Sequence, residues 1–357
     1  MSWLLYGANG YTGELIARAA AARGLAPVLA GRGALPLERL AAALGLTRRV
    51  FGLEDAAVLD RALEGVSAVL HCAGPFSRTA RPMAAACLRQ GVHYLDITGE
   101  APVFEELAAQ GVAARARGVM LLPGSGFDVV PSDCLAAHLK RRLPTATRLA
   151  LAFQPSRGIS RGTALTLIEN VHRGGLVRRD GVLARVPPGY RTRRIDFGRG
   201  PRPAITIPWG DVSTAFHSTG IPGVEVYLAA PASLRWGIRA TRLLGPVLGS
   251  GPVQRLLRRR VLERRPGPDA DERARGRCLL WGEAADTLER VAVSRLRTPE
   301  GYELTCLTAL ALVERVLAGD VHPGFQTPSR AYGPDFILAI PGVERSDEPM
   351  RSGPFME

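Results

Sequence analysis

Three evenly spaced glycines directly behind an apolar run are the clearest chemical feature of the sequence. Gly7, Gly10 and Gly13 lie in YGANGYTG, after a strand-like run at 3–6 and before ELIARAAAARG, whose apolar residues recur at helical spacing. Glycine allows a tight turn and a close approach of the backbone to a pyrophosphate, which meets the N–H groups at the helix N-terminus. The segment predicts the first strand–turn–helix unit of a dinucleotide-binding fold.

A cation follows the second predicted strand. APVLAGR ends at Arg32, where a site specific for NAD normally carries a carboxylate that binds the ribose hydroxyls. Arginine instead presents a planar cation to a 2′-phosphate. We therefore expect the cofactor NADP(H); in the alternative interpretation, Arg32 is an ordinary solvated charge.

Strand-like and helix-like segments alternate along the next part of the chain. SAVLHCAGPF, VHYLDITGE and VMLLPG resemble strands, with helical patterns between them, and this alternation is typical of an α/β doubly wound parallel sheet. Ligands bind beyond the carboxyl ends of such strands, so turns at 73–75, 98–100 and 124–128 should border the cofactor crevice.

The pattern changes in the second half, where short β-like runs surround one predicted helix at 163–175. We expect a Rossmann domain at 1–130, to which 325–357 returns, and a mixed α/β (α+β) substrate domain at 131–324. The junction should lie between Gly124 and Ser132. The segment 324–340 is expected to form a turn, a short helix and a strand.

Composition excludes several kinds of chemistry. Lys140 is the only lysine and Ala136 precedes it by four residues, so the sequence lacks the tyrosine–lysine pair of short-chain dehydrogenases. The five cysteines show no CxxC spacing, and they and the six histidines are dispersed, so no metal site is expected. No membrane span or signal peptide is visible, and we expect a cytoplasmic protein.

The protein has a net charge of +13, and the segment 235–265 is especially rich in arginine. Its arginines alternate with apolar residues at helical spacing. Three interpretations stay open: a helix pair with a solvated face, a docking surface for an acidic acyl carrier protein, and peripheral membrane contact. Nucleic acid is not an expected partner, because no aromatic stacking platform or known binding motif accompanies the charge. The sequence does not settle the oligomeric state; a homodimer is one option.

Taken together, several blocks resemble the saccharopine dehydrogenase-like family, closest to its branch of trans-acting enoyl reductases. They include YGANGYTG, CAGPF, GVHYLDITGE, GFDVVPSD, STGIPGVEVY and GFQTPSRAYGPD, in this order over nearly the whole chain. The resemblance implies an N-terminal NADP-binding Rossmann domain. Carried over by position, it implies that the cofactor is bound by the glycine loop, by Arg32 and by the first four residues of CAGPF. These residues are Gly7, Ala8, Asn9, Gly10, Tyr11, Thr12, Gly13, Arg32, Cys72, Ala73, Gly74 and Pro75.

The expected reaction is hydride transfer from NADPH to an enoyl thioester, with candidate proton donors or orienting groups at Tyr94, Asp96 and Asp128. Ser132 and Asp133 are further candidates, although they could simply cap a helix. Two alternatives stay open. One is oxidoreduction of a C–N bond in an amino-acid substrate, with carboxylates bound by Arg157, Arg161 or the run 191–194. The other is an NADP-binding or membrane-associated scaffold without turnover.

Overall fold

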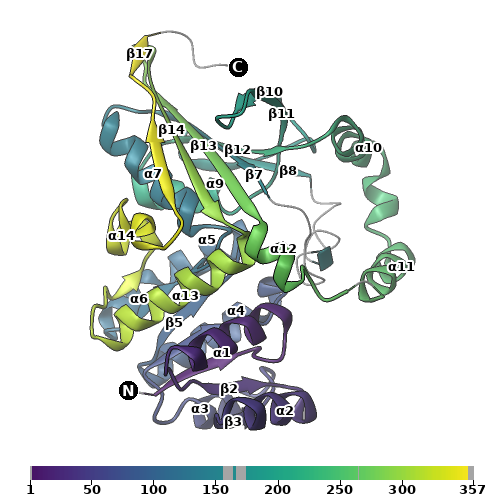
Figure 1. Cartoon of the computed structure of the whole chain (residues 1–357), viewed down its shortest axis with the longest axis vertical. Coiled ribbons are helices and arrows are strands. Elements are labelled where there is room, and N and C mark those ends of the chain that lie inside the picture. The colour runs from purple at the N-terminus through teal and green to yellow at the C-terminus, as the bar shows by residue number, and fades with distance from the viewer. Residues whose placement is uncertain (1, 156–163, 166–173, 264, 353–357) are drawn as a thin grey trace. The chain divides into compact units, whose positions relative to one another are not determined.

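A computed structural model describes residues 2–155, 164–165, 174–263 and 265–352 of the chain. The chain divides into two compact units. The first consists of Met1–Val130 and Tyr302–Ala331, and the second of Pro131–Gly301 and Tyr332–Glu357. Figure 1 labels the helices and strands of both units.

The first unit is built on a seven-stranded sheet in which every paired strand runs parallel to its neighbours, in the order β15-β6-β5-β4-β1-β2-β3. The direction of strand order reverses between β1 and β4, which creates the switch point at which ligands bind in such sheets. The strands are β1 (Trp3–Tyr6), β2 (Val28–Gly31), β3 (Arg48–Val50), β4 (Ala68–His71), β5 (His93–Asp96), β6 (Met120–Leu122) and β15 (Gly324–Phe325). The predicted doubly wound sheet is confirmed.

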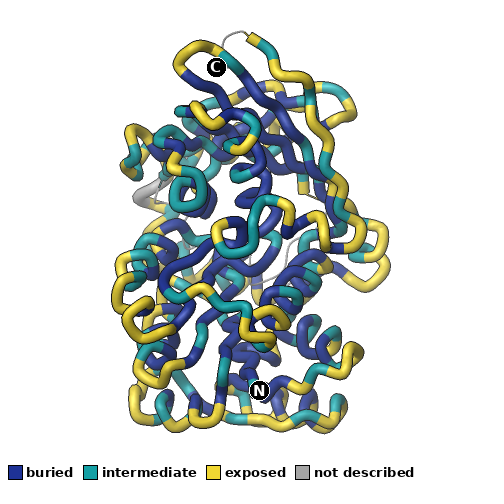
Figure 2. Tube along the Cα trace, turned by 90° about the vertical axis from the view of Figure 1, so that its left-hand side faces the viewer, coloured by how far each residue is buried: buried dark blue, intermediate teal, exposed yellow. Residues whose placement is uncertain are grey.

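Helices connect these strands and cover both faces of the sheet. They are α1 (Tyr11–Ala22), α2 (Ala34–Leu44), α3 (Ala56–Ala62), α4 (Phe76–Gln90), α5 (Ala101–Ala109), α6 (Gly111–Ala116), α13 (Gly301–Leu317) and α14 (Pro328–Tyr332). Tyr6, Val69 and Tyr94 pack with residues of α3 to α6 in one core cluster. The alternate strand residues Leu5 and Leu70 are also fully buried, as expected for strands covered on both sides. The buried stretches follow these strands in Figure 2.

The second unit contains a mixed ten-stranded sheet. Its main path is β10-β11-β12-β7-β13-β14-β16, with β17 paired to β14 and a β8–β9 hairpin attached to β12. Only the β7–β12 pair is parallel among these described pairs. The strands are β7 (Arg148–Gln154), β8 (Gly175–Arg179), β9 (Val182–Val186), β10 (Thr192–Asp196), β11 (Pro201–Thr206), β12 (Gly223–Ala229), β13 (Arg277–Ala285), β14 (Arg290–Pro299), β16 (Glu344–Asp347) and β17 (Arg351–Ser352).

The helices of the second unit are α7 (Val130–Arg142), α9 (Asp211–Thr219), α10 (Ala232–Leu248), α11 (Gly251–Leu262), α12 (Ala270–Arg275) and the 3-10 helix η1 (Phe336–Ala339). Helix α7 packs on the sheet at Gly282, where a Cβ atom would lie 2.6 Å from Leu139 Cδ1. The second sheet and its helices form the mixed α/β arrangement that the sequence predicts.

The C-terminal part of the chain differs from the expectation. Residues 302–324 belong to the first unit rather than to the second, while 325–331 belong to the first unit as expected, with β15 paired to β6. Residues 332–357 belong to the second unit and do not return to the first, because β16 pairs with β14. The strand predicted near residue 340 is wrong: 336–339 form η1, and the strand β16 begins at Glu344. The predicted helix at 163–175 lies almost wholly outside the described residues.

A buried ion pair connects two strands of the second sheet. Arg193 on β10 donates from Nη2 to Glu283 Oε1 on β13 at 2.9 Å, and their side chains are 3% and 0% exposed. Arg351 donates to the other carboxylate oxygen at 3.0 Å. The guanidinium of Arg193 also lies over the Trp281 ring, 4.9 Å from its centroid. Removing one member of such a pair leaves a buried charge without compensation.

We therefore predict that Glu283→Ala lowers the free energy of unfolding by about 3–5 kcal/mol in chemical denaturation, because Arg193 stays buried without its partner. The matched control is Glu344→Ala, which removes an exposed partner of Arg297 and should cost less than about 1 kcal/mol. Equal losses of unfolding free energy in the two variants would contradict the conclusion that the buried Arg193–Glu283 pair stabilises the fold.

Candidate nucleotide-binding site

The loop between β1 and α1 forms a tight turn at the carboxyl end of the central strand. Gly7 adopts φ +83°, and its N–H donates to the Ala30 carbonyl of β2 at 2.8 Å. The N–H of Ala8 donates to the same carbonyl at 3.1 Å. The N-cap of α1 is Gly10, which has no side chain to cap the helix, and Tyr11, Thr12 and Gly13 form its first turn. The positive end of the α1 dipole is thus available to an anion.

Steric crowding requires glycine at two positions of this loop. A Cβ atom at Gly13 would lie 2.1 Å from the Gly7 carbonyl oxygen, and one at Gly7 would lie 2.8 Å from the Ala73 nitrogen. At Gly10 the nearest atom to such a Cβ is the Gly7 oxygen at 3.2 Å. The loop therefore lies against its own helix and against the turn after β4. This cradle fits a pyrophosphate, because only the absence of side chains lets the backbone approach one.

The turn after β2 borders the same loop through Asn9. A Cβ atom at Gly31 would lie 2.8 Å from Asn9 Oδ1, and one at Gly33 would lie 3.3 Å from Asn9 Nδ2. Arg32 lies between these two glycines and is exposed, as a residue that binds a 2′-phosphate must be. Asn9 thus joins the glycine loop to the segment that carries the predicted determinant of cofactor choice.

The turn after β4 contains Cys72, Ala73, Gly74 and Pro75, with a cis peptide bond between the last two. The Cys72 N–H donates to the Tyr6 carbonyl at 2.8 Å, so the turn continues directly beside β1. The pKa of the Cys72 thiol is raised well above its ordinary value by burial, with the nearby Cys306 and Asp96 adding to the shift. Cys72 is therefore a protonated thiol, consistent with the absence of any activating motif in the sequence.

The N-terminus of α4, next to this turn, already holds an anion. Glu100 accepts hydrogen bonds from the N–H groups of Phe76 at 2.9 Å and Ser77 at 3.3 Å. The carboxylate thus satisfies this helix end from within the unit. A bound pyrophosphate would accordingly be favoured at α1 rather than at α4. Sequence reasoning placed Glu100 at the crevice but did not assign it this capping role.

Tyr94 and Asp96, two predicted catalytic residues, contact each other at the end of β5. The Tyr94 hydroxyl donates to Asp96 Oδ2 at 2.7 Å, and both residues are fully buried. Asp96 Oδ1 accepts the N–H groups of Thr98 and Gly124, each at 2.9 Å. Burial raises the pKa of Asp96 to about 6 against the opposing effect of these bonds. The pair holds the turns after β5 and β6 together, a geometry that favours a positioning role.

Asp128, the third predicted catalytic residue, lies in the turn after β6 and is only partly buried. Its carboxylate packs against Gly99, where a Cβ atom would lie 2.9 Å from Asp128 Oδ2. Dehydration raises the pKa of Asp128 to about 7, which keeps a large protonated fraction near neutral pH. Of the three predicted residues, Asp128 has the accessibility and protonation state best suited to a proton donor.

His71 is a buried residue that the sequence analysis did not single out. It ends β4 among the rings of Tyr6, Phe76 and Tyr94, with centroids 5.3, 5.4 and 6.3 Å away. Burial lowers its pKa to about 3, and neither ring nitrogen has a hydrogen-bond partner within the described part of the chain. His71 is consequently neutral at physiological pH and belongs to the aromatic core.

Helix α13 supplies groups to the site that no local sequence signal indicated. Thr305 Oγ1 accepts the Phe127 N–H at 3.0 Å, and Thr308 donates to the Ser125 carbonyl at 2.9 Å. The rings of Tyr302 and Tyr11 meet edge to face at 5.1 Å. The two hydrogen bonds join α13 to the turn after β6 across 178 and 183 residues of sequence, and the ring contact joins it to the start of α1 across 302 − 11 = 291 residues.

The remaining candidates lie elsewhere. Ser132 and Asp133 are fully buried in the first turn of α7, in the second unit, and Asp133 accepts a hydrogen bond from the Ser218 hydroxyl. This geometry suits the helix-terminal role that the sequence left open for them. Arg157 and Arg161, the predicted carboxylate-binding arginines, lie outside the described residues.

The glycine cradle, the strand order and the N-terminus of α1 together define a dinucleotide-binding Rossmann domain, and comparison with known families agrees. Residues 3–122 match the model of the saccharopine dehydrogenase NADP binding domain. The matched residues lie in the first unit, and the resemblance stated from the sequence is confirmed.

Curated relatives with two different names match part of the chain. The human saccharopine dehydrogenase-like oxidoreductase is 29% identical over 161 residues, 39% of this chain and 37% of the relative. The trans-acting enoyl reductase of Mycobacterium leprae (strain TN) is 33% identical over 148 residues, 39% of this chain and 35% of the relative. The matched segment thus spans little more than a third of either relative.

A solved structure has a similar fold over the whole chain. Apo histidine-tagged saccharopine dehydrogenase (L-Glu forming) from Saccharomyces cerevisiae superposes with a TM-score of 0.66, covering 98% of this chain and 100% of that chain. The sequence identity is 10%, so the likeness shows the fold alone.

We predict that Gly13→Ala weakens NADPH binding by at least about tenfold, a loss of ~1.4 kcal/mol, because the added methyl would overlap the Gly7 carbonyl and force the cradle open. In an ordinary helix the same change would stabilise the protein. Gly10→Ala is the control, because its added Cβ would lie 3.2 Å from the nearest atom, the Gly7 oxygen. It should weaken NADPH binding less than Gly13→Ala. Isothermal titration of the two variants measures both affinities; an unchanged affinity of Gly13→Ala would exclude the cradle as the pyrophosphate site.

Proposed function

We propose that this protein is an NADPH-dependent oxidoreductase that reduces the C=C bond of an enoyl thioester. The observation that carries the proposal is the side-chain-free cradle before α1, in a domain of the NADP-binding type. The name of the mycobacterial relative, trans-acting enoyl reductase, supports the choice of reaction. NADPH, when bound, supplies a hydride to an electron-poor carbon.

Residues of the first unit would bind the cofactor, position the turns of the site and donate the proton. The glycine loop and the α1 N-terminus bind the pyrophosphate, and Arg32 binds the 2′-phosphate. The Tyr94–Asp96 pair positions the turns after β5 and β6. Asp128, in the turn after β6, would protonate the α-carbon of the reduced acyl group, since its raised pKa leaves a proton available near neutral pH.

The main alternative is oxidoreduction at a C–N bond, as the name saccharopine dehydrogenase-like oxidoreductase of other relatives suggests. Such a site needs arginines that are available to the carboxylates of an amino acid. Within the predicted run 191–194, Arg191 contacts Glu225 at 3.1 Å and Arg193 contacts Glu283 at 2.9 Å. Because these two cations already bind carboxylates of the protein, the run gives this alternative less support.

We expect Arg32→Asp to raise the dissociation constant of NADPH by about 10- to 100-fold and to shift preference toward NADH, because a charged contact worth about 1.5–3 kcal/mol is replaced by repulsion of the 2′-phosphate. Fluorescence titration with both cofactors measures the shift. Arg23→Asp, which makes the same charge change at another exposed position, is the control. If NADPH affinity were unchanged in Arg32→Asp, the assignment of Arg32 would be wrong.

The reaction itself is tested by NADPH oxidation with enoyl thioesters, compared with mixtures of oxo acids and amines. We expect turnover with the thioesters, with a rate that falls as pH rises through about 7, because Asp128 must be protonated to act as an acid. Asp128→Asn should lower kcat by about 10²–10⁴-fold and abolish this pH dependence. Turnover only with oxo acid and amine would support the C–N alternative, and NADPH binding without oxidation of either class would support a scaffold.

A further inference from the structure

Helices α10 and α11 form an arm that leaves the second sheet after β12 (Figure 1). Two arginines of α10 fix its position within the second unit. Arg242 donates to the carbonyls of Pro188 and Gly189, each at 2.8 Å, and Arg235 donates to the Ala230 carbonyl at 2.9 Å. The adjacent side of α10, about 100° around the helix from these two arginines, can therefore face outward without loss of the attachment.

The outward side of α10 is apolar. The exposed fractions are 72% for Trp236, 87% for Leu243 and 57% for Val247. With Ala240 these residues follow the spacing i, i+4, i+7, i+11, which places them along one face of a helix. A tryptophan and two aliphatic residues in one exposed stripe are costly in water and indicate a surface that is covered in use.

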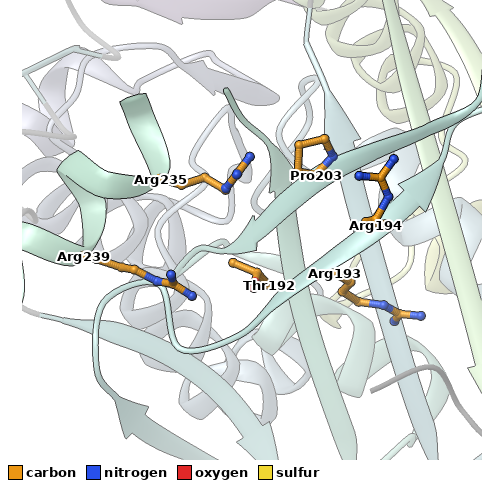
Figure 3. A pocket seen from close by; sticks show the side chains of 6 residues that line it. All are labelled: Thr192, Arg193, Arg194, Pro203, Arg235 and Arg239. Carbon is orange, nitrogen blue, oxygen red and sulfur yellow. The ribbon is translucent and has the colours of Figure 1, made fainter. Parts of the chain in front are cut away.

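An arginine-lined hollow borders this stripe. It encloses about 310 Å³ between α10 and the edge of the sheet and is lined by Thr192, Arg193, Arg194, Pro203, Arg235 and Arg239. In Figure 3 the side chains of Arg235 and Arg239 extend from α10 toward β10 and β11. Arg239 is three residues after Trp236 and four before Leu243, so it neighbours the stripe on the helix surface. Arg193 is already paired with Glu283, but Arg194, Arg235 and Arg239 also line the hollow and no acidic side chain does, so it suits a phosphate.

Helix α11 repeats the combination of apolar and basic residues. Leu256 and Leu262 are 55% and 56% exposed, and Arg255, Arg259 and Arg260 are exposed beside them. The arm thus presents aliphatic side chains and a tryptophan among arginines on two successive helices. Arginine stems can lie along an apolar phase while their guanidinium groups bind phosphates at its boundary.

We propose that α10 and α11 form a peripheral binding surface for anionic phospholipid membranes. The apolar stripe would enter the boundary between headgroups and acyl chains, and the arginine hollow would hold a lipid phosphate. No helix among the described residues is long and apolar enough to cross a bilayer, so the arm lies along the membrane. An acidic carrier protein would satisfy the arginines, but the exposed Trp236 and Leu243 require an apolar phase as well. A second copy of this chain, with its own charge of +13, would be repelled.

The test uses the protein of the full sequence and vesicles of phosphatidylcholine, with and without about 30% phosphatidylglycerol, because anionic lipids attract basic surfaces. We expect flotation with the anionic vesicles only, together with a blue shift of tryptophan emission. Of the four tryptophans, Trp3 and Trp281 are buried, Trp209 is half-buried and Trp236 is 72% exposed, so the shift should arise mainly from Trp236 and should disappear in Trp236→Phe. Flotation of the protein with neither vesicle, or with both to the same extent, would overturn the proposal.

Matched variants separate the arm from a general charge effect. Leu243→Asp and Arg239→Glu should reduce flotation at least about tenfold, while Leu288→Asp and Arg199→Glu should leave it unchanged, because these exposed control residues lie outside the arm. Thermal unfolding, measured in parallel, verifies that each variant is folded. Equal losses in the arm and control variants would contradict the proposal, as would binding of an acidic carrier protein through Leu243 and Arg239 with no binding to vesicles.

Discussion

The first unit depends on the close approach of backbone to backbone around Gly7 and Gly13. The start of α1 lies so near β1 that even a methyl group at Gly13 would overlap the Gly7 carbonyl, and the turn after β4 excludes one at Gly7. This packing leaves the N-terminus of α1 next to an open backbone turn at the switch point of the sheet. The ability to bind a pyrophosphate thus follows from a steric constraint, and the helix dipole adds the electrostatic part.

The polar residues around this cradle differ in role because they differ in burial and in hydrogen-bond partners. Glu100 neutralises the end of α4, and Asp96 gathers two backbone N–H groups and the Tyr94 hydroxyl in the interior. Each of these carboxylates is occupied with hydrogen bonds that maintain the turns. Asp128 is more accessible and has a pKa raised toward neutrality, which is why we assign it the proton transfer. Neighbouring carboxylates thus differ in role because they differ in solvation and in their partners.

The second unit uses its charge in two ways. In the interior, Arg193 is matched by Glu283 and covered by the Trp281 ring, so its cation contributes to a specific sheet arrangement. On the arm, Arg239 and its neighbours surround exposed apolar side chains, a combination that a soluble helix pair with a merely solvated face does not require. The high arginine content is therefore distributed between structural pairs and an outward-facing surface.

The sequence by itself determined the elements whose signals are local. The glycine spacing, the strand before it and the helix after it predicted the cradle, and alternating patterns predicted the parallel sheet, because apolar periodicity and glycine turns act within a few residues. Arg32 could be chosen from its position after β2 alone.

Only the tertiary structure decided which distant segments complete the site. Thr305 and Tyr302 reach the turns after β6 and β1 from the far end of the chain, and Glu100 reaches α4 from the next strand. Strand pairing also placed β15 beside β6, and it placed β16 beside β14, contrary to the expected return of the residues after 331 to the first unit. Such contacts depend on long-range packing and on which sheet edge is open. Neither can be predicted from the local spacing of apolar residues in the sequence.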